Sequence, residues 1–351
     1  MIRLVRRLGR DMRSSQQHYS LIIASIFLLT SLLFWFLMSY SGLGRTTSQV
    51  ASAKEKDTVI TRPVQSAGCG KPSPQVPGTS SEQAIFSGGI TRYYLLHIPK
   101  GYRDTTGDAL ILAFHGHGSS ATQQENLTGF SAFADAYNVI AAYPQGAVGA
   151  DHHTGWNTGP AWNPATNDVL YISDLLQRLQ ARWCINPRRI YAVGFSNGGG
   201  MTNLLACKLA GRIAAFGSVS GAYPAAPGGC HPMRPVPFIE LHGTGDRVVP
   251  YGGSLAKGYP PITHWLRQWV QRDGCTGNPV VFFDRANVIG ERWTKCLDHV
   301  SLVHYMIGGM GHMWPHHLII HFRGQITTLD ASTLIWVFIR NYSLPPNGLK
   351  T

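Results

Sequence analysis

A short serine segment between glycines constrains the fold of this chain more than any other feature. The segment 194–198 reads Gly-Phe-Ser-Asn-Gly; it follows an apolar run at 189–193 that predicts a buried strand and precedes a run at 201–209 that predicts a helix. A strand that turns into a helix this sharply leaves room only for small residues beside the serine, and Gly194 and Gly198 meet that need. The pattern predicts a turn that lifts the Ser196 hydroxyl clear of a sheet.

Apolar runs and helical spacings alternate on both sides of this turn. Strands are predicted at 90–99, 109–114, 139–143, 189–193, 215–219, 238–241 and 300–306. Helices are predicted at 168–183, 201–209, 262–270 and 331–340, the first capped by Asn167 or Asp168 and the last by Asp330. Such alternation is typical of an α/β fold, a mostly parallel sheet with helices on both faces and a site at the carboxyl ends of its strands. We predict a single catalytic domain over 81–345.

The N-terminal part of the chain has a different composition. Residues 1–20 carry five arginines, and residues 21–39 are almost wholly apolar, close to the ~20 residues that a membrane-spanning helix needs. This predicts a cytoplasmic N-terminus followed by a signal anchor, favoured by the bulky residues at 34–37, or by a cleavable signal peptide. Residues 40–80, rich in Ser, Thr, Gly, Pro and Gln, predict a linker. Either interpretation places the remaining chain outside the cytoplasm, secreted or tethered to the membrane.

Charge and cysteine content agree with export. The formal net charge is +12, but beyond the N-terminus the basic residues form no cluster, which argues against a nucleic-acid partner. An even number of cysteines is typical of disulfides in an exported chain, and there are six: Cys69, Cys184, Cys207, Cys230, Cys275 and Cys296. Proximity along the chain suggests Cys207–Cys230 and Cys275–Cys296, which leaves Cys69–Cys184, although the sequence alone does not choose among the possible pairings.

A serine hydroxyl becomes a strong nucleophile only beside a base that a third group orients. After Ser196, Asp246 follows the predicted strand at 238–241, and His312 lies in a glycine-rich segment after the strand at 300–306. Ser, Asp and His in this order predict a triad in which Ser196 attacks, His312 moves the proton and Asp246 orients the imidazole. Other histidines compete for the base role. We interpret His304 as structural, and a metal-binding pair of His317 and His321 on a helix lacks an acidic partner, so we expect no metal.

Two backbone N–H groups are needed to stabilise the oxyanion that such an attack creates. We expect one from Asn197, directly after the serine, and the other from His117, in the glycine-rich loop after the strand at 109–114. Trp156 and Trp314 are candidates for stacking on a substrate, with packing as the alternative. A metal-ligand set at 151–153 is less favoured than a solvated loop.

Ser196, Asn197, Asp246, His312 and Trp314 fall within segments that together resemble one family, whereas His117 is a departure from its pattern. The segments are 66–71, 94–99, 143–146, 194–201, 242–246 and 311–315. From Cys69 to the predicted C-terminal helix, the chain resembles secreted feruloyl esterases and the related polyhydroxybutyrate-depolymerase-like esterases. The resemblance implies an α/β-hydrolase fold, a serine acyl-enzyme mechanism and no cofactor. It also implies feruloyl or acetyl esters of plant polysaccharide, or short hydroxyalkanoate polyesters, as substrates. An acyltransferase with the same triad and a binding module with an inactive site are the alternatives.

Overall fold

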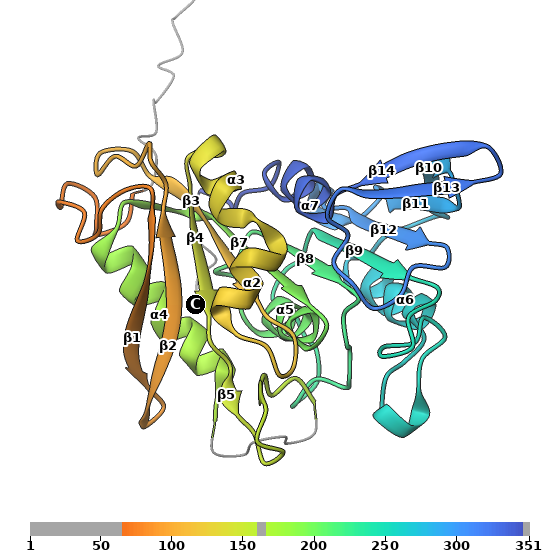
Figure 1. Ribbon diagram of the computed structural model, residues 1–351, viewed down its shortest axis with the longest axis horizontal. Helices are drawn as coiled ribbons and strands as arrows, with labels where there is room; N and C mark the ends of the chain where they lie inside the picture. Colours follow the sequence, from red (N-terminus) through yellow and green to blue (C-terminus); the bar gives the residue numbers. More distant parts are fainter. Residues whose placement is uncertain (1–64, 160–165, 347–351) are drawn as a thin grey trace, which may run out of the picture. The chain divides into compact units, whose positions relative to one another are not determined.

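The computed structural model describes residues 65–159 and 166–346, which are built around one large sheet (Figure 1). Its strands lie in the order β1, β2, β4, β3, β7, β8, β9, β12, β11, β10. Neighbours from β4 to β12 are parallel, whereas both edges of the sheet are antiparallel. In chain order the strands are β1 Thr79–Ser87, β2 Ile90–Ile98, β3 Asp108–Phe114, β4 Val139–Pro144, β7 Ile185–Phe195, β8 Ala215–Val219, β9 Phe238–Gly243, β10 Val280–Arg285, β11 Val288–Trp293 and β12 Leu302–Ile307.

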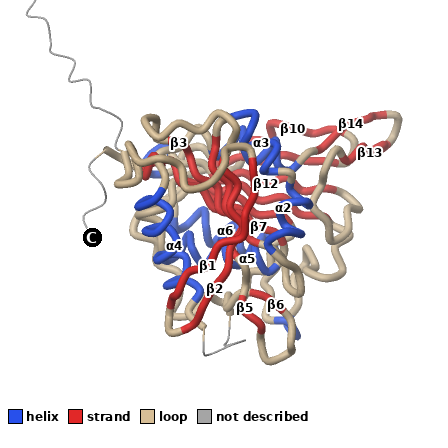
Figure 2. The backbone as a smooth tube through the Cα atoms, turned by 60° about the vertical axis from the view of Figure 1, so that its left-hand side comes forward, coloured by secondary structure: helices blue, strands red, loops and turns tan. Residues whose placement is uncertain are grey.

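Helices cover both faces of this sheet, which is the layer order seen in Figure 2. One buried cluster contains residues of α4 Asp168–Arg182, α5 Asn197–Lys208 and α6 Ile262–Arg272. A second buried cluster contains residues of α2 Ala121–Thr128, α3 Phe130–Tyr137 and α7 Ala331–Ile339. A central strand such as β3 is therefore buried along its whole length and reads as an apolar run rather than as an alternation.

Several smaller elements lie outside the large sheet. Two short hairpins are formed by β5 Ala147–Val148 with β6 Thr154–Gly155, and by β13 Leu318–Phe322 with β14 Gln325–Leu329. The second hairpin projects beside β10 (Figure 1). Two 3₁₀ turns occupy Leu255–Lys257 and Leu297–His299.

The predicted central strands and the four predicted helices are present, with three kinds of difference. Asn167 caps α4 by accepting the Leu170 N–H at 2.9 Å, whereas Asp168 pairs with buried Arg92 at 2.8 Å. The helix after the serine begins at Asn197, several residues earlier than predicted, because the turn feeds straight into it. The strands β1, β10 and β11, both hairpins and the short helices α2 and α3 were not predicted, since each is too short or too mixed in polarity to give a clear period.

The predicted linker is shorter than expected at its C-terminal end. Cys69 is bonded to Cys184, Ser66 Oγ donates to the Trp183 carbonyl at 2.7 Å, and the Gly68 N–H donates to the Gln180 carbonyl at 2.8 Å. These bonds fasten residues 66–69 to the end of α4, so this part of the predicted linker packs on the domain. The predicted basic segment 1–20, the membrane segment 21–39 and the linker up to residue 64 lie outside the described residues. No helix within 65–159 or 166–346 is both long and apolar enough to cross a bilayer.

The three suggested disulfides are all present. Their pairs are Cys69–Cys184, Cys207–Cys230 and Cys275–Cys296. All six cysteines of the chain are therefore used, and no thiol remains unpaired. The first bond joins positions 115 residues apart, so it closes a much longer loop than the other two.

Candidate active site

The turn between β7 and α5 has the sharp geometry that the sequence predicted. Ser196 lies at φ 57° and ψ −120°, a region that non-glycine residues rarely occupy and that often marks a functional position. A Cβ atom at position 194 would collide with the Gly198 carbonyl oxygen, and one at position 198 would collide with the Phe114 carbonyl oxygen. Glycine is required at both positions because the backbone passes so close to itself and to β3.

Asp246 and His312 meet at the carboxyl ends of two neighbouring parallel strands, β9 and β12. His312 Nδ1 lies 2.7 Å from Asp246 Oδ2, and Asp246 Oδ1 accepts the Val248 and Val249 N–H groups at 2.8 Å each. Burial raises the pKa of Asp246, but the hydrogen bonds from His312 and Val249 outweigh it and hold that pKa below its usual value. The His312 ring packs on Phe195, the residue before the serine, with ring centroids 4.9 Å apart.

The loop after β3 lies directly against the serine. A Cβ atom at Gly116 would come within 3.3 Å of Ser196 Cβ, so this loop approaches Ser196 at van der Waals distance. His115 supports the loop from inside: burial lowers its pKa to about 4, and the neutral ring donates from Nδ1 to the Gly116 carbonyl at 2.7 Å. Its Nε2 accepts the Gly146 N–H at 2.9 Å, which fixes the tautomer.

A cleft of about 390 Å³ opens beside Ser196. Exposed His117 and Asp151 are among its lining residues, with His117 Nε2 2.7 Å from Asp151 Oδ2. Asp151 is therefore exposed, as a solvated loop would have it, but its carboxylate also pairs with a histidine of the loop after β3. The remaining lining residues are Trp156, Thr158, Gly159, Asn197, Ala222, Pro224, Val248, Val249, Lys257 and Tyr259. This volume falls in the lower part of the range for small-molecule sites.

Comparison with known proteins agrees with this geometry. The family described as "Esterase PHB depolymerase" matches residues 93–231. Feruloyl esterase B of Piromyces equi is 30% identical over 269 residues, which are 72% of this chain and 46% of that protein. The chain is therefore similar to feruloyl and polyhydroxybutyrate-depolymerase-like esterases over most of its described length.

Two further similarities add detail. A bifunctional acetylxylan esterase/xylanase of Neocallimastix patriciarum is 29% identical over 205 residues, which are 58% of this chain and 28% of that protein. The chain therefore spans less than half the length of either relative. The solved acetyl xylan esterase of Aspergillus awamori superposes with a TM-score of 0.52 at 14% identity, covering 68% of this chain and 96% of that one. Together with the sheet order, that likeness identifies the fold as an α/β-hydrolase.

The two tryptophans suggested for substrate stacking have different surroundings in the structure. Trp156 lines the cleft but is only 1% exposed; its indole N–H donates to the His115 carbonyl at 2.9 Å, and its backbone N–H donates to the Asn197 side chain at 2.8 Å. It positions both loops around the serine. Trp314 is buried between Phe130 and Phe195, donates to Ser332 Oγ at 3.1 Å and does not line the cleft. The stacking interpretation is wrong for Trp314, because the core already covers its ring.

A buried group of charged side chains lies behind Asp246, and the sequence reading missed most of it. Glu240 Oε1 lies 2.8 Å from His242 Nδ1, and its other oxygen lies 2.7 Å from His304 Nδ1. His242 Nε2 contacts the Val249 carbonyl at 2.8 Å and lies 3.5 Å from Asp246 Oδ2. Glu240 and His242 are two residues apart on β9 and so share a face, and that spacing was the signal available in the sequence.

The remaining histidines have structural surroundings. His304 is 1% exposed on β12 and also contacts the Tyr251 hydroxyl at 2.9 Å, which confirms its structural interpretation. His317 precedes β13 and His321 lies within that strand, so the two do not share a helix face, and the helical metal pair that the sequence analysis disfavoured is absent. A larger hollow of about 920 Å³ lies beside the start of α4, and none of Ser196, Asp246 and His312 lines it.

Proposed function

We propose that this chain is an exported carboxylic ester hydrolase that works through a Ser196–His312–Asp246 triad. The observation that carries the proposal is the 2.7 Å contact between His312 Nδ1 and Asp246 Oδ2, next to a serine held in a strained turn. A contact of this kind fixes the imidazole tautomer, so that Nε2 is the nitrogen left to exchange a proton with Ser196. The family match supports the same chemistry independently of the geometry.

In the first half-reaction, Ser196 Oγ attacks the ester carbonyl carbon while His312 Nε2 takes the hydroxyl proton. The carbonyl oxygen becomes an oxyanion, which accepts hydrogen bonds from the backbone N–H groups of Asn197 and His117. The intermediate collapses when the C–O bond to the alcohol breaks and His312 returns its proton to the departing oxygen. The acyl group then remains on Ser196 as an ester.

In the second half-reaction, His312 takes a proton from water, and the resulting hydroxide attacks the acyl carbon. Collapse of the second tetrahedral intermediate gives the proton back to Ser196 Oγ and releases the carboxylic acid. Asp246 stays ionised throughout, because hydrogen bonds from His312 and Val249 outweigh its burial and hold its pKa below the usual value.

Feruloyl or acetyl esters of plant polysaccharide are the proposed substrates. The names of the similar enzymes, feruloyl esterase B and acetylxylan esterase/xylanase, support this class. The apolar side of the cleft, with Val248, Val249 and Tyr259, suits an aromatic acyl group, and its size also admits acetyl. A polyhydroxyalkanoate depolymerase is the second candidate, supported by the family description itself.

Three disulfides support action in an oxidising compartment outside the cytoplasm. The apolar segment 21–39 would deliver the domain there, either as an anchor or as a cleaved signal. Protease protection of the domain in intact cells tests this, because a protected cytoplasmic domain contradicts export.

Substitution of Ser196 tests the catalytic assignment. We expect Ser196→Ala to abolish hydrolysis of p-nitrophenyl acetate and labelling by a fluorophosphonate, with the thermal unfolding midpoint retained. Ser343→Ala, near the C-terminal end of the domain, is the matched control and should keep both the hydrolysis and the fluorophosphonate labelling. Substantial hydrolysis by the Ser196→Ala variant would refute the triad. Methyl ferulate, acetylated xylan and polyhydroxybutyrate assayed side by side separate the two substrate classes.

A further inference from the structure

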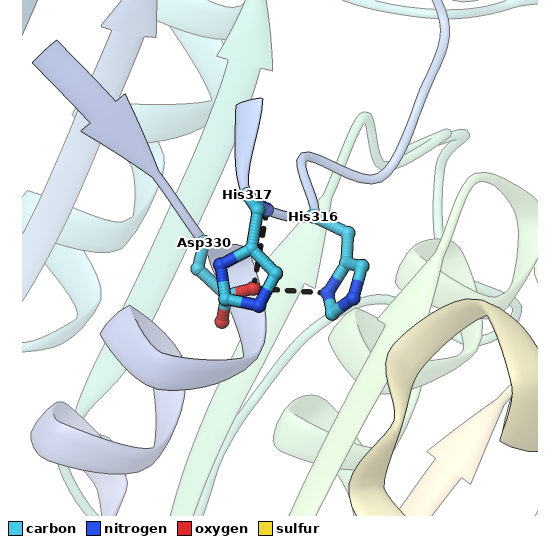
Figure 3. Close-up of side chains that lie close together, drawn as sticks. All are labelled: His316, His317 and Asp330. Atoms are coloured by element: carbon cyan, nitrogen blue, oxygen red, sulfur yellow. Dashed lines mark hydrogen bonds and ion pairs between the residues drawn. The ribbon is translucent and has the colours of Figure 1, made fainter. Parts of the chain in front are cut away.

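Three side chains that could bind a metal meet at the base of the β13–β14 hairpin. His316 and His317 directly precede β13, and Asp330 directly follows β14 (Figure 3). The hairpin register pairs Leu318 with Leu329, so the residues just outside this pair are brought opposite one another. One ligand atom from each of the three side chains lies within 4.8 Å of the others, and His316 Nδ1 is already 3.0 Å from Asp330 Oδ2.

The carboxylate of this group is held in place before any ion arrives. Asp330 caps α7, and its Oδ1 accepts the Thr333 N–H at 2.8 Å. Its Oδ2 faces the histidines and also accepts the His317 backbone N–H at 3.4 Å. The adjoining chain is fastened as well, because the Ala331 N–H donates to the Pro315 carbonyl at 2.8 Å. A ligand oriented by hydrogen bonds to its other oxygen is the usual arrangement in metal sites.

The two histidines are close to each other and accessible. Their ring centroids lie 4.5 Å apart, and both residues are exposed. His317 has a φ of 47°, in the left-handed region that costs roughly 1–2 kcal/mol for a residue with a side chain. The fold therefore maintains a strained residue at this place, which commonly marks a functional position.

Two imidazoles and one carboxylate form a ligand set that is typical of Zn²⁺. Tetrahedral bonds of about 2.0–2.1 Å require ligand atoms roughly 3.3 Å apart, and rotation of exposed side chains suffices to reach that separation. We propose that His316, His317 and Asp330 bind one Zn²⁺ ion and leave a fourth position to water. The ion would join the loop that carries His312 to the start of α7.

Because Asp330 also serves the helix N-terminus, we expect weaker binding than at a closed four-ligand site. The cysteine thiols do not compete, since all six are in disulfides. This site goes beyond the proposed function, because the ester hydrolysis described above uses no metal.

Calorimetric titration of the purified full-length chain with ZnCl₂, after treatment with a chelator, tests the proposal. We expect His317→Asn and Asp330→Asn each to weaken Zn²⁺ binding at this site by at least ~10-fold. Both replacements are chosen to preserve the fold, because Asn tolerates the left-handed region and is also a good N-cap. His321→Ala, exposed on the neighbouring strand β13, is the control and should bind Zn²⁺ as the unmodified chain does.

Thermal unfolding gives a second readout. Added Zn²⁺ should raise the unfolding midpoint of the unmodified chain and of His321→Ala, and it should leave His317→Asn and Asp330→Asn unchanged. Equal Zn²⁺ affinity in all four proteins, or an equal loss in the His321→Ala variant, overturns the proposal. Neither readout depends on ester hydrolysis, so failure of the zinc site leaves the proposed function untouched.

Discussion

The buried charges behind the triad make the sharpest prediction about stability. Glu240 is fully buried, and its two oxygens lie 2.8 Å and 2.7 Å from the imidazoles of His242 and His304. Burial raises the pKa of Glu240, but the positive charge of His242 outweighs it and brings that pKa below its usual value. Burial lowers the pKa of His242, but the Glu240 charge and hydrogen bond raise it above its usual value. Both shifts favour the ionised form of the pair.

The substitution Glu240→Gln removes the charge and keeps nearly the same shape. Removing one partner of a buried ion pair costs about 3–5 kcal/mol, because the other charge stays buried without compensation. For a domain of this size, 1 kcal/mol moves the unfolding midpoint by about 2–4 °C, so we expect a fall on the order of 10 °C.

The loss should depend on pH with a definite sign. A histidine whose pKa is raised by folding stabilises the protein fully below its unfolded pKa of about 6.5, and that contribution disappears as the pH rises through the folded-state pKa. The destabilisation by Glu240→Gln should therefore be larger at pH 6 than at pH 9.

Thermal unfolding followed by circular dichroism at both pH values measures this effect. Glu82→Gln, an exposed glutamate on edge strand β1, is the matched control and should change stability by no more than about 0.5 kcal/mol. The reasoning is refuted if Glu240→Gln unfolds within the range of this control at pH 6, or if its deficit is the same at both pH values.

Three further results are expected. Asp246→Asn should lower kcat on p-nitrophenyl acetate by about 10⁴, since the amide favours the wrong imidazole tautomer; retention of a tenth of the activity contradicts the triad. Replacing Cys69 and Cys184 by alanine should lower the free energy of unfolding in urea by about 5 kcal/mol, against about 3 kcal/mol for Cys275 and Cys296. The reason is that the first bond closes a loop of 115 residues and the other a loop of 21. A larger loss for the Cys275 and Cys296 variant argues against this account. Burial lowers the pKa of His115 to about 4, so the free energy of unfolding should fall by about 3 kcal/mol between pH 6.5 and pH 4 through this group. Urea unfolding of a His115→Gln variant should show a smaller fall with pH. The same fall in the variant and the unmodified protein would falsify the neutral buried ring.

Features that depend on neighbouring residues were predictable from the sequence. The strand, turn and helix around Ser196 could be predicted because local sterics demand glycine where the backbone doubles back. The cap at Asp330 is local in the same sense. Even the Cys207–Cys230 bond could be suggested, because its partners lie only 23 residues apart.

Several features that depend on pairs distant in the chain were not predictable. Nothing in the sequence reading distinguished a stacking tryptophan from a packed one, and only the contacts with Phe130 and Phe195 assign Trp314 to the core. Likewise, the helical spacing suggested for His317 and His321 disappears when that segment pairs with β14 as a strand, whose register brings Asp330 to the two histidines at 316 and 317 instead.

By itself, the amino-acid sequence determined the layered α/β architecture and the chain order of serine, aspartate and histidine, since apolar period and turn chemistry act over short stretches. The tertiary structure alone decided that β9 and β12 lie side by side, and this adjacency brings His312 to Asp246 and His304 to Glu240. The physical reason is that strand neighbours are chosen by the packing of whole helices and sheet faces, a sum over many weak contacts that no short segment contains.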